Sequence, residues 1–259
     1  MTRPARFVVS ALISVALVGS ILLVRYLRSR PASPPAISST LLPNIPIKAR
    51  PLLRSFNGCL PEGDGGDPDL NRLKNRVDEG QYVAVPFDAV AQMEWPRTIE
   101  RRRRADWSTA DTTAVERYEG LPISVDGYVA GARLEGPESP NCHGADREFR
   151  DFHIWLTKTA GEDRTRSIVV EMTPALRAQH PNWTTEILGH CVRDQNRVRV
   201  SGWLMLDPEH PDQVGKTRGT IWEIHPIISF EVEQNGKWIS LDDFTDVTKS
   251  TKPTKEPRR

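Results

Sequence analysis

The chain has 259 residues, of which 35 are Lys or Arg and 34 are Asp or Glu, so its formal net charge is +1. This length allows one or two domains with a real core, and the composition excludes a collagen-like chain, a multi-span membrane protein and a disulfide-dense miniprotein. The charge is unevenly distributed: residues 1–30, 31–54 and 245–259 carry +5, +3 and +3, which leaves −10 for residues 55–244.

An uncharged run of 18 residues begins at Phe7 and ends at Val24. As a helix it would be about 27 Å long, close to the thickness of a bilayer core. A cleaved signal peptide is the rival interpretation, but arginines at 25, 28 and 30 follow the run where small cleavage-site residues are expected. We expect residues 1–30 to form an uncleaved, single-pass transmembrane anchor with basic flanks.

Residues 31–54 contain six prolines and no acidic residue, which predicts a semi-rigid Pro-rich linker. Three arginines follow the apolar run and two precede it, a balance that favours a cytoplasmic C-terminal side. The linker and the usual export of a domain behind such an anchor favour the opposite orientation. We expect an extracytoplasmic C-terminal domain.

The three cysteines, Cys59, Cys142 and Cys191, are widely spaced and contain no CxxC pair. This spacing excludes zinc-finger and thioredoxin-type sites. Either one disulfide with one free thiol or three unpaired thiols fits the sequence equally well.

Residues 55–120 are expected to form a helical accessory region. Asp67 is a predicted N-cap followed by Pro68 at the first helical position, and Gly80 is the predicted end of that helix. The expected apolar stripe consists of Leu70, Leu73 and Val77. A calcium loop beginning at Asp67 is disfavoured, since Arg72 stands where the loop needs glycine.

A short basic run, Arg97 and residues 101–104, lies between Trp95 and Trp107. Basic residues next to aromatic ones can bind nucleic acid or anionic lipid. The body around this run has a charge of −10, which would repel phosphates. We therefore expect a solvated helix face here, and we expect no nucleic-acid partner.

From residue 121 the apolar residues alternate with a period of two. Strands are predicted over 121–129, 152–157, 168–172, 198–206 and 220–232, and Asn235-Gly236 predicts a hairpin turn into a last strand over 237–241. A helical stretch starting at Thr173-Pro174, broken at Pro181 and recapped by Asn182, separates the third strand from the fourth. This order indicates a mainly β domain over 121–241, an OB-fold-like five-stranded Greek-key barrel. Residues 242–259 are expected to be a disordered basic tail.

Four short motifs carry a resemblance. They are His153-Ile-Trp-Leu, Val170-Glu171-Met-Thr-Pro, Gly202-Trp-Leu-Met-Leu-Asp207-Pro-Glu-His210 and Trp222-Glu223-Ile-His225-Pro226. In this order they resemble a family of bacterial membrane-anchored or secreted envelope proteins with OB-like barrels and no settled function. The resemblance covers about residues 121–241 and implies a fold and a location, but no reaction.

Several polar residues of the strands share the face opposite their apolar neighbours, and others crowd the loop after the fourth strand. The candidate binding residues are His153, Glu171, Asp207, His210, Glu223 and His225, with Trp155 and Trp203 as candidate aromatic contacts for sugars. Histidines and carboxylates on adjacent strands could ligate zinc or manganese, but a buried polar network explains the same pattern.

The sequence favours a membrane-tethered envelope protein whose barrel binds a glycan or a protein partner. The alternative is a metal-dependent, nuclease-like hydrolase that uses the histidine–carboxylate group. We assign no catalytic residue and expect no required cofactor, although a divalent metal fits the residue types. Phosphate loops, nucleophile elbows and zincin motifs are absent from the sequence.

Overall fold

The computed structural model of the chain describes residue 42 and residues 50–244. The chain divides into two units, residues 1–36 and residues 37–259, and only the second contains described residues. The predicted anchor and most of both the Pro-rich linker and the basic tail lie outside the described residues. Within the described part, no helix combines the length and apolar character that a membrane span requires.

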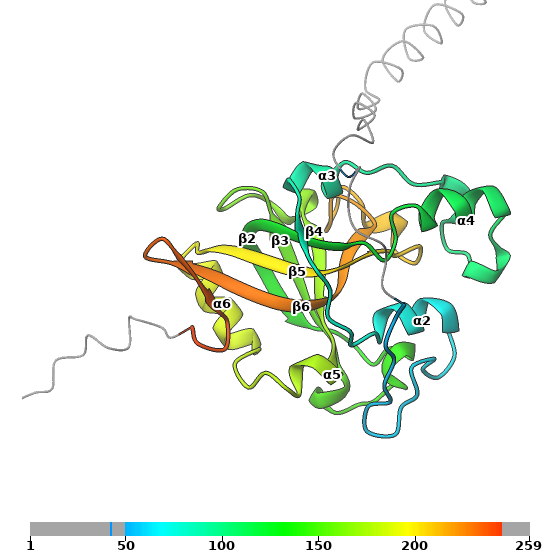
Figure 1. The fold of residues 1–259 in the computed structure, drawn as a ribbon, viewed down its shortest axis with the longest axis horizontal. Helices are drawn as coiled ribbons and strands as arrows, with labels where there is room; N and C mark the ends of the chain where they lie inside the picture. The colour runs from blue at the N-terminus through cyan, green and yellow to red at the C-terminus, as the bar shows by residue number, and fades with distance from the viewer. Residues whose placement is uncertain (1–41, 43–49, 245–259) are drawn as a thin grey trace, which may run out of the picture. The chain divides into compact units, whose positions relative to one another are not determined.

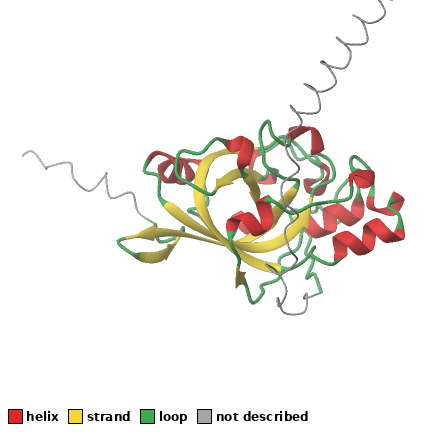
Figure 2. Ribbon diagram, turned by 90° about the horizontal axis from the view of Figure 1, so that it is seen from above, coloured by secondary structure: helices red, strands yellow, loops and turns green. Residues whose placement is uncertain are grey.

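Five strands form a closed barrel of mixed parallel and antiparallel pairs (Figures 1 and 2). They are β2 (Pro122–Leu134), β3 (Phe152–Thr157), β4 (Ile168–Met172), β5 (Arg197–Leu206) and β6 (Trp222–Gln234). The order around the barrel is β2-β3-β4-β6-β5, and β5 pairs with β2 to close it. The β4–β6 pair is parallel and the other four are antiparallel. The mainly β class and the closed five-stranded barrel are confirmed.

Two short strands extend the sheet. β1 (Val83–Ala84) runs parallel to the start of β2, and β7 (Lys237–Ser240) forms a hairpin with the end of β6. Asn235 and Gly236 connect this hairpin with φ angles of 54° and 73°, as the Asn-Gly pair predicts.

Alternation along the strands separates an apolar interior from a polar outer face. Ile154 on β3, Val170 on β4 and Ile224 on β6 are fully buried in the main hydrophobic core. Their sequence neighbours belong to the opposite face of the same strands, because successive side chains point to opposite sides of a sheet. This outer face carries the histidines and carboxylates predicted as site residues.

The helical segment between β4 and β5 divides into α5 (Pro174–Arg177) and α6 (Thr185–Arg193), which packs against β2. Its break at Pro181 is as predicted, but Thr184 and not Asn182 caps α6, its hydroxyl accepting a hydrogen bond from the amide of Ile187. Asn182 instead donates a side-chain hydrogen bond to the carbonyl of Asp242.

Residues 55–120 contain three α-helices, α2 (Pro68–Lys74), α3 (Phe87–Ala91) and α4 (Thr109–Glu116). Asp67 caps α2 with Pro68 at its first position, as predicted. The predicted end at Gly80 is wrong, and of the predicted stripe only Leu70 is fully buried, whereas Leu73 and Val77 are half-buried. The helix ends at Lys74, and its buried residues are Leu70, Asn71 and Lys74. The chain turns early because Asn75 caps the helix and Arg76 forms a β-bridge with Leu53.

The arginine run is not a helix face. It contains two 3-10 turns, Arg97–Ile99 and Arg104–Asp106. Arg104 makes a paired contact of 2.6 and 2.7 Å with the carboxylate of Glu119 and donates to the carbonyl of Leu206. One arginine of the run therefore holds the accessory region against the end of β5. The other 3-10 turns of the described residues are Ser139–Asn141, Arg147–Phe149, Arg164–Arg166 and Pro211–Gln213.

A disulfide joins Cys59 to Cys142, whose Cα atoms lie 5.7 Å apart, and Cys191 is a buried free thiol. The bond connects the accessory region to the loop between β2 and β3. Hydrogen bonds from Asp64 N to Ser139 O (2.9 Å) and from Asn75 Nδ2 to Pro140 O (2.7 Å) strengthen the same contact. Of the two alternatives that the sequence left open, the structure has one disulfide and one free thiol.

Candidate functional site

Ionisable side chains gather on the outer face of β3, β4 and β6. The register pairs His153 on β3 with Glu171 on β4 and places Glu223 on β6 opposite Val169 of β4. Alternation puts His225 on the same face as Glu223. Although this face points away from the barrel core, these four residues are at most 7% exposed.

All six predicted site residues belong to one continuous chain of ion pairs, which we call the ionic layer. His153 Nδ1 lies 3.3 Å from Glu171, whose other oxygen lies 3.5 Å from His225 Nδ1. His225 Nδ1 lies 3.4 Å from Glu223. The chain then passes to Asp207 through an arginine that the sequence analysis did not select.

That arginine is Arg218, in the loop between β5 and β6. Its Nη1 donates to Glu223 at 2.6 Å and to Asp207 at 3.1 Å, and the chain ends with His210 Nδ1, 2.6 Å from Asp207. Arg218 is 3% exposed, so it compensates two buried carboxylates at once.

The accessory region and the β2–β3 loop supply further residues that the sequence analysis missed. Lys74 on α2 is 5% exposed and lies 4.0 Å from Glu138 and 3.7 Å from Glu209. Glu135 contacts His153 at 3.0 Å. Asp151 is buried beside Glu171 and His225. Asp151 lies just before β3 and two residues before His153, a spacing that could have indicated the same side of the chain.

The histidines of the ionic layer are biased toward the protonated form. Burial lowers the pKa of His153, but hydrogen bonds to Glu135 and Glu171 outweigh it and raise that pKa to about 9. Burial likewise opposes charge on His225, and Glu171 and Glu223 raise its pKa nonetheless. These shifts stabilise cationic imidazoles next to anionic carboxylates.

The carboxylates divide into two groups. The pKa of Glu171 would rise through burial, but the two neighbouring imidazoles hold it far below its usual range. Burial and the nearby Glu171 charge raise the pKa of Asp151 to about 8, and burial raises that of Glu138. Asp151 therefore carries a proton at neutral pH unless another cation replaces it.

Asp207 and His210 form the rim of the layer, where pH should change stability. The hydrogen bond to Asp207 raises the pKa of His210 above its usual value. The stabilisation should be complete below the unfolded-state pKa of about 6.5 and should disappear as pH rises through the folded-state pKa. The side chain of His210 is 49% exposed, so we expect His210→Gln to cost less than about 1 kcal/mol at low pH, after solvent screening.

Denaturant unfolding of wild type and His210→Gln from pH 5 to pH 9 checks this expectation. The difference in unfolding free energy should shrink toward zero as pH rises. A difference that grows with pH would contradict the proposed pairing.

Trp155 and Trp203, the predicted aromatic contacts, are 6% and 1% exposed. Trp155 packs beside His153, with ring centroids 4.8 Å apart. The guanidinium of Arg76 covers Trp203, with its central carbon 3.4 Å from the ring centroid. Stacking of either ring on a sugar therefore remains a prediction, and it would require Arg76 to move in the case of Trp203.

A groove of about 870 Å³ lies between the β2–β3 loop and the α5–α6 segment. Apolar side chains are the most numerous in its walls, and acidic and basic side chains of both signs lie among them. They include Asp146, Arg147, Glu148, Phe152, Arg177, Ala178, His180, Trp183 and Glu186. His180 stacks on Trp183 with ring centroids 4.1 Å apart, and Arg177 stacks on Phe152 at 3.7 Å. The groove is distinct from the ionic layer, and the sequence analysis did not find it.

Comparison with known proteins gives no family: no protein-family model, curated protein or solved structure matches this chain. Functional inference consequently depends on the geometry of the ionic layer and the groove.

Proposed function

We propose that this chain is a membrane-tethered envelope protein whose OB-fold-like barrel is a binding or interaction domain. The observation that carries the binding role is the open groove beside α5 and α6, since the ionic layer is closed to solvent. The barrel supports the finer fold assignment. Its strand order, its parallel β4–β6 pair and the helical segment between the third and fourth barrel strands fit the OB-fold arrangement.

The disulfide supports an extracytoplasmic domain. Structural disulfides form and persist in oxidising compartments and are rare in the cytosol. A bond between Cys59 and Cys142 therefore agrees with the orientation expected from the Pro-rich linker. A phosphatase fusion after Lys249 tests the orientation: we expect an active fusion, since this enzyme needs an oxidising compartment, whereas a fluorescent cytoplasmic reporter there should then be dark.

The groove favours a ligand without strong charge. The carboxylates Asp146, Glu148 and Glu186 outnumber the arginines Arg147 and Arg177 by only one, so the walls carry both signs of charge and no strong excess of either. Such a lining suits a neutral oligosaccharide or a segment of a partner protein better than a nucleic acid, which requires a basic surface. We expect the purified full chain to bind an oligosaccharide on an array of neutral glycans.

Filling the groove tests this role directly. Ala178 is exposed and lines the groove, so Ala178→Trp should occupy it without disturbing the core. We expect a loss of at least about 10-fold in affinity for a glycan selected on the array, corresponding to about 1.4 kcal/mol. Gln179→Trp, at the next exposed position, is the matched control and should bind normally. If the chain binds no glycan, or if Ala178→Trp binds as tightly as wild type, the groove is not the glycan-binding site.

A metal-dependent hydrolase is the second candidate, and the cluster of Asp151, Glu171 and His225 is the observation that favours it. A catalytic metal keeps an open position for water and substrate. Asp151 and His225 are each 1% exposed, a burial that suits a closed site better than a catalytic one. The binding role is therefore preferred.

A further inference from the structure

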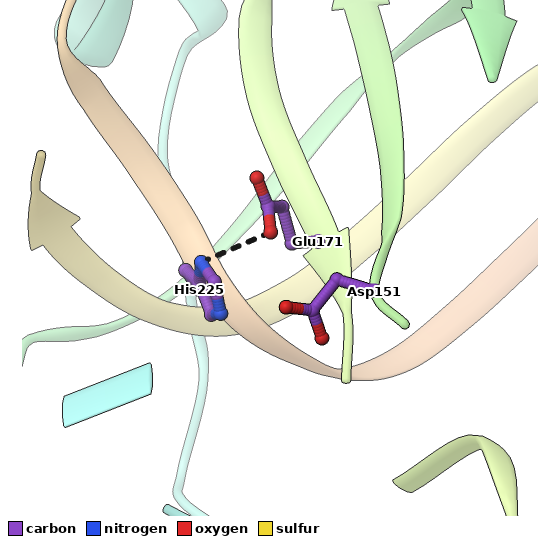
Figure 3. A group of neighbouring side chains, drawn as sticks. All are labelled: Asp151, Glu171 and His225. Atoms are coloured by element: carbon purple, nitrogen blue, oxygen red, sulfur yellow. Dashed lines mark ion pairs between the residues drawn. The ribbon is translucent and has the colours of Figure 1, made fainter. Parts of the chain in front are cut away.

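Asp151, Glu171 and His225 converge within the ionic layer. One potential ligand atom from each lies within 4.8 Å of the other two. Both carboxylates point toward the imidazole ring of His225 (Figure 3). The three residues come from different elements, the end of the β2–β3 loop, β4 and β6, so a bound ion would join three parts of the barrel.

Each of these residues has a buried polar atom without a hydrogen-bond partner among the described residues. These atoms are Asp151 Oδ1, Glu171 Oε2 and His225 Nε2. Glu171 Oε2 lies 3.5 Å from His225 Nδ1 but makes no hydrogen bond. Buried polar atoms normally have partners, so three unpartnered ligand-type atoms in one cluster indicate that a further group binds there.

The second polar atom of each side chain contacts a neighbouring side chain, and these contacts fix the orientation of the three residues. Asp151 Oδ2 accepts a hydrogen bond from Asn141 Nδ2 at 2.9 Å. Glu171 Oε1 lies 3.3 Å from His153 Nδ1, and His225 Nδ1 lies 3.4 Å from Glu223 Oε2. A carboxylate behind the imidazole and hydrogen bonds behind the carboxylates are the outer-shell contacts that orient metal ligands.

We propose that Asp151, Glu171 and His225 bind a divalent metal ion, zinc or manganese, in a closed site that stabilises the fold. One imidazole and two carboxylates suit these ions. Two ligands each about 2.1 Å from a metal lie at most about 4.2 Å apart, so the side chains must approach by several tenths of an ångström. Water or a second carboxylate oxygen completes the coordination. The site does not depend on the groove or its ligand.

The experiment uses the purified full chain after chelator treatment and dialysis. Calorimetric titration with Zn²⁺ or Mn²⁺ should give one bound ion per chain. Thermal unfolding should shift upward by about 5–10 °C at an ion concentration about 100-fold above Kd. Co²⁺ should give visible absorption bands typical of bound nitrogen and oxygen ligands.

Asp151→Asn keeps the side-chain volume but removes a ligand charge, and we expect it to weaken binding by at least about 100-fold and abolish the thermal shift. Asp242→Asn is the matched control. Asp242 also contacts a histidine, His180 at 2.6 Å, but lies outside the layer, so its variant should bind normally. Absence of stoichiometric binding to wild type, or unchanged binding by Asp151→Asn, overturns the proposal. If Asp151→Asn does not fold, His225→Gln replaces it, and if neither folds, the thermal shift of wild type decides.

Discussion

Replacing Arg218 with methionine should destabilise the protein by about 3–5 kcal/mol, because it leaves two buried carboxylates without their shared counter-charge. The guanidinium is 3% exposed and contacts Glu223 at 2.6 Å and Asp207 at 3.1 Å, and the two carboxylates are themselves at most 2% exposed. Methionine fills a similar volume, so the loss would reflect charge and hydrogen bonding. Denaturant unfolding of the purified chain at pH 7 measures it.

A surface pair provides the control for Arg218. Arg199 contacts Asp126 at 2.7 Å, but its side chain is 31% exposed, so Arg199→Met should cost at most about 1 kcal/mol. The double variant Arg218→Met/Glu223→Gln should recover part of the loss, since it removes one of the stranded charges. If Arg218→Met and Arg199→Met lower the free energy of unfolding by the same amount, the result contradicts the view that the ionic layer is shielded from solvent.

The strand pattern predicted the strand residues of this layer but not their environment. Alternation by two places His153, Glu171, Glu223 and His225 opposite the apolar core, and the structure has them there. Periodicity states which face a side chain occupies, but it does not state whether another segment covers that face. The sequence therefore allowed an open site, whereas Lys74 and the β2–β3 loop close it.

The missed residues belong to irregular segments. Arg218 lies in a loop, and its two carboxylate partners come from β6 and the end of β5. Lys74 lies on α2, where the apolar spacing pointed to Leu73 and not to a lysine. A buried lysine is stabilised only by carboxylates that are remote in sequence, such as Glu138. Local pattern contains no information on such pairings.

The closed layer and the open groove have separate physical roles. The layer joins β3, β4, β6, α2 and the β2–β3 loop through charges, so it fixes the arrangement of the outer segments on the barrel. The groove shares the same loop, since residues 146–148 line it together with residues of α5 and α6. A stable layer would thus hold one wall of the groove in place. The disulfide, at residue 142 of this loop, is the covalent part of that attachment.

Breaking the disulfide should cost about 2–5 kcal/mol, because the bond closes a long loop and restricts the unfolded chain. Cys59 and Cys142 are 83 residues apart in sequence, and the loop between them contains the accessory region, β1 and β2. The double variant Cys59→Ala/Cys142→Ala should unfold at a lower denaturant concentration. The reduced wild type should match it, since Cys191 is not bonded.

Thiol labelling and a test with reductant show whether the loss of stability comes from the Cys59–Cys142 bond and not from another effect of the reducing agent. Burial raises the pKa of the Cys191 thiol to about 12, so the folded, oxidised chain should react negligibly with a thiol reagent at pH 8 and should show one thiol after unfolding. Dithiothreitol should leave the double variant's unfolding midpoint unchanged. A double variant as stable as the oxidised wild type would contradict this prediction. It would show that the hydrogen bonds from Asp64 and Asn75 are enough to hold the β2–β3 loop. The disulfide would then no longer support an extracytoplasmic location.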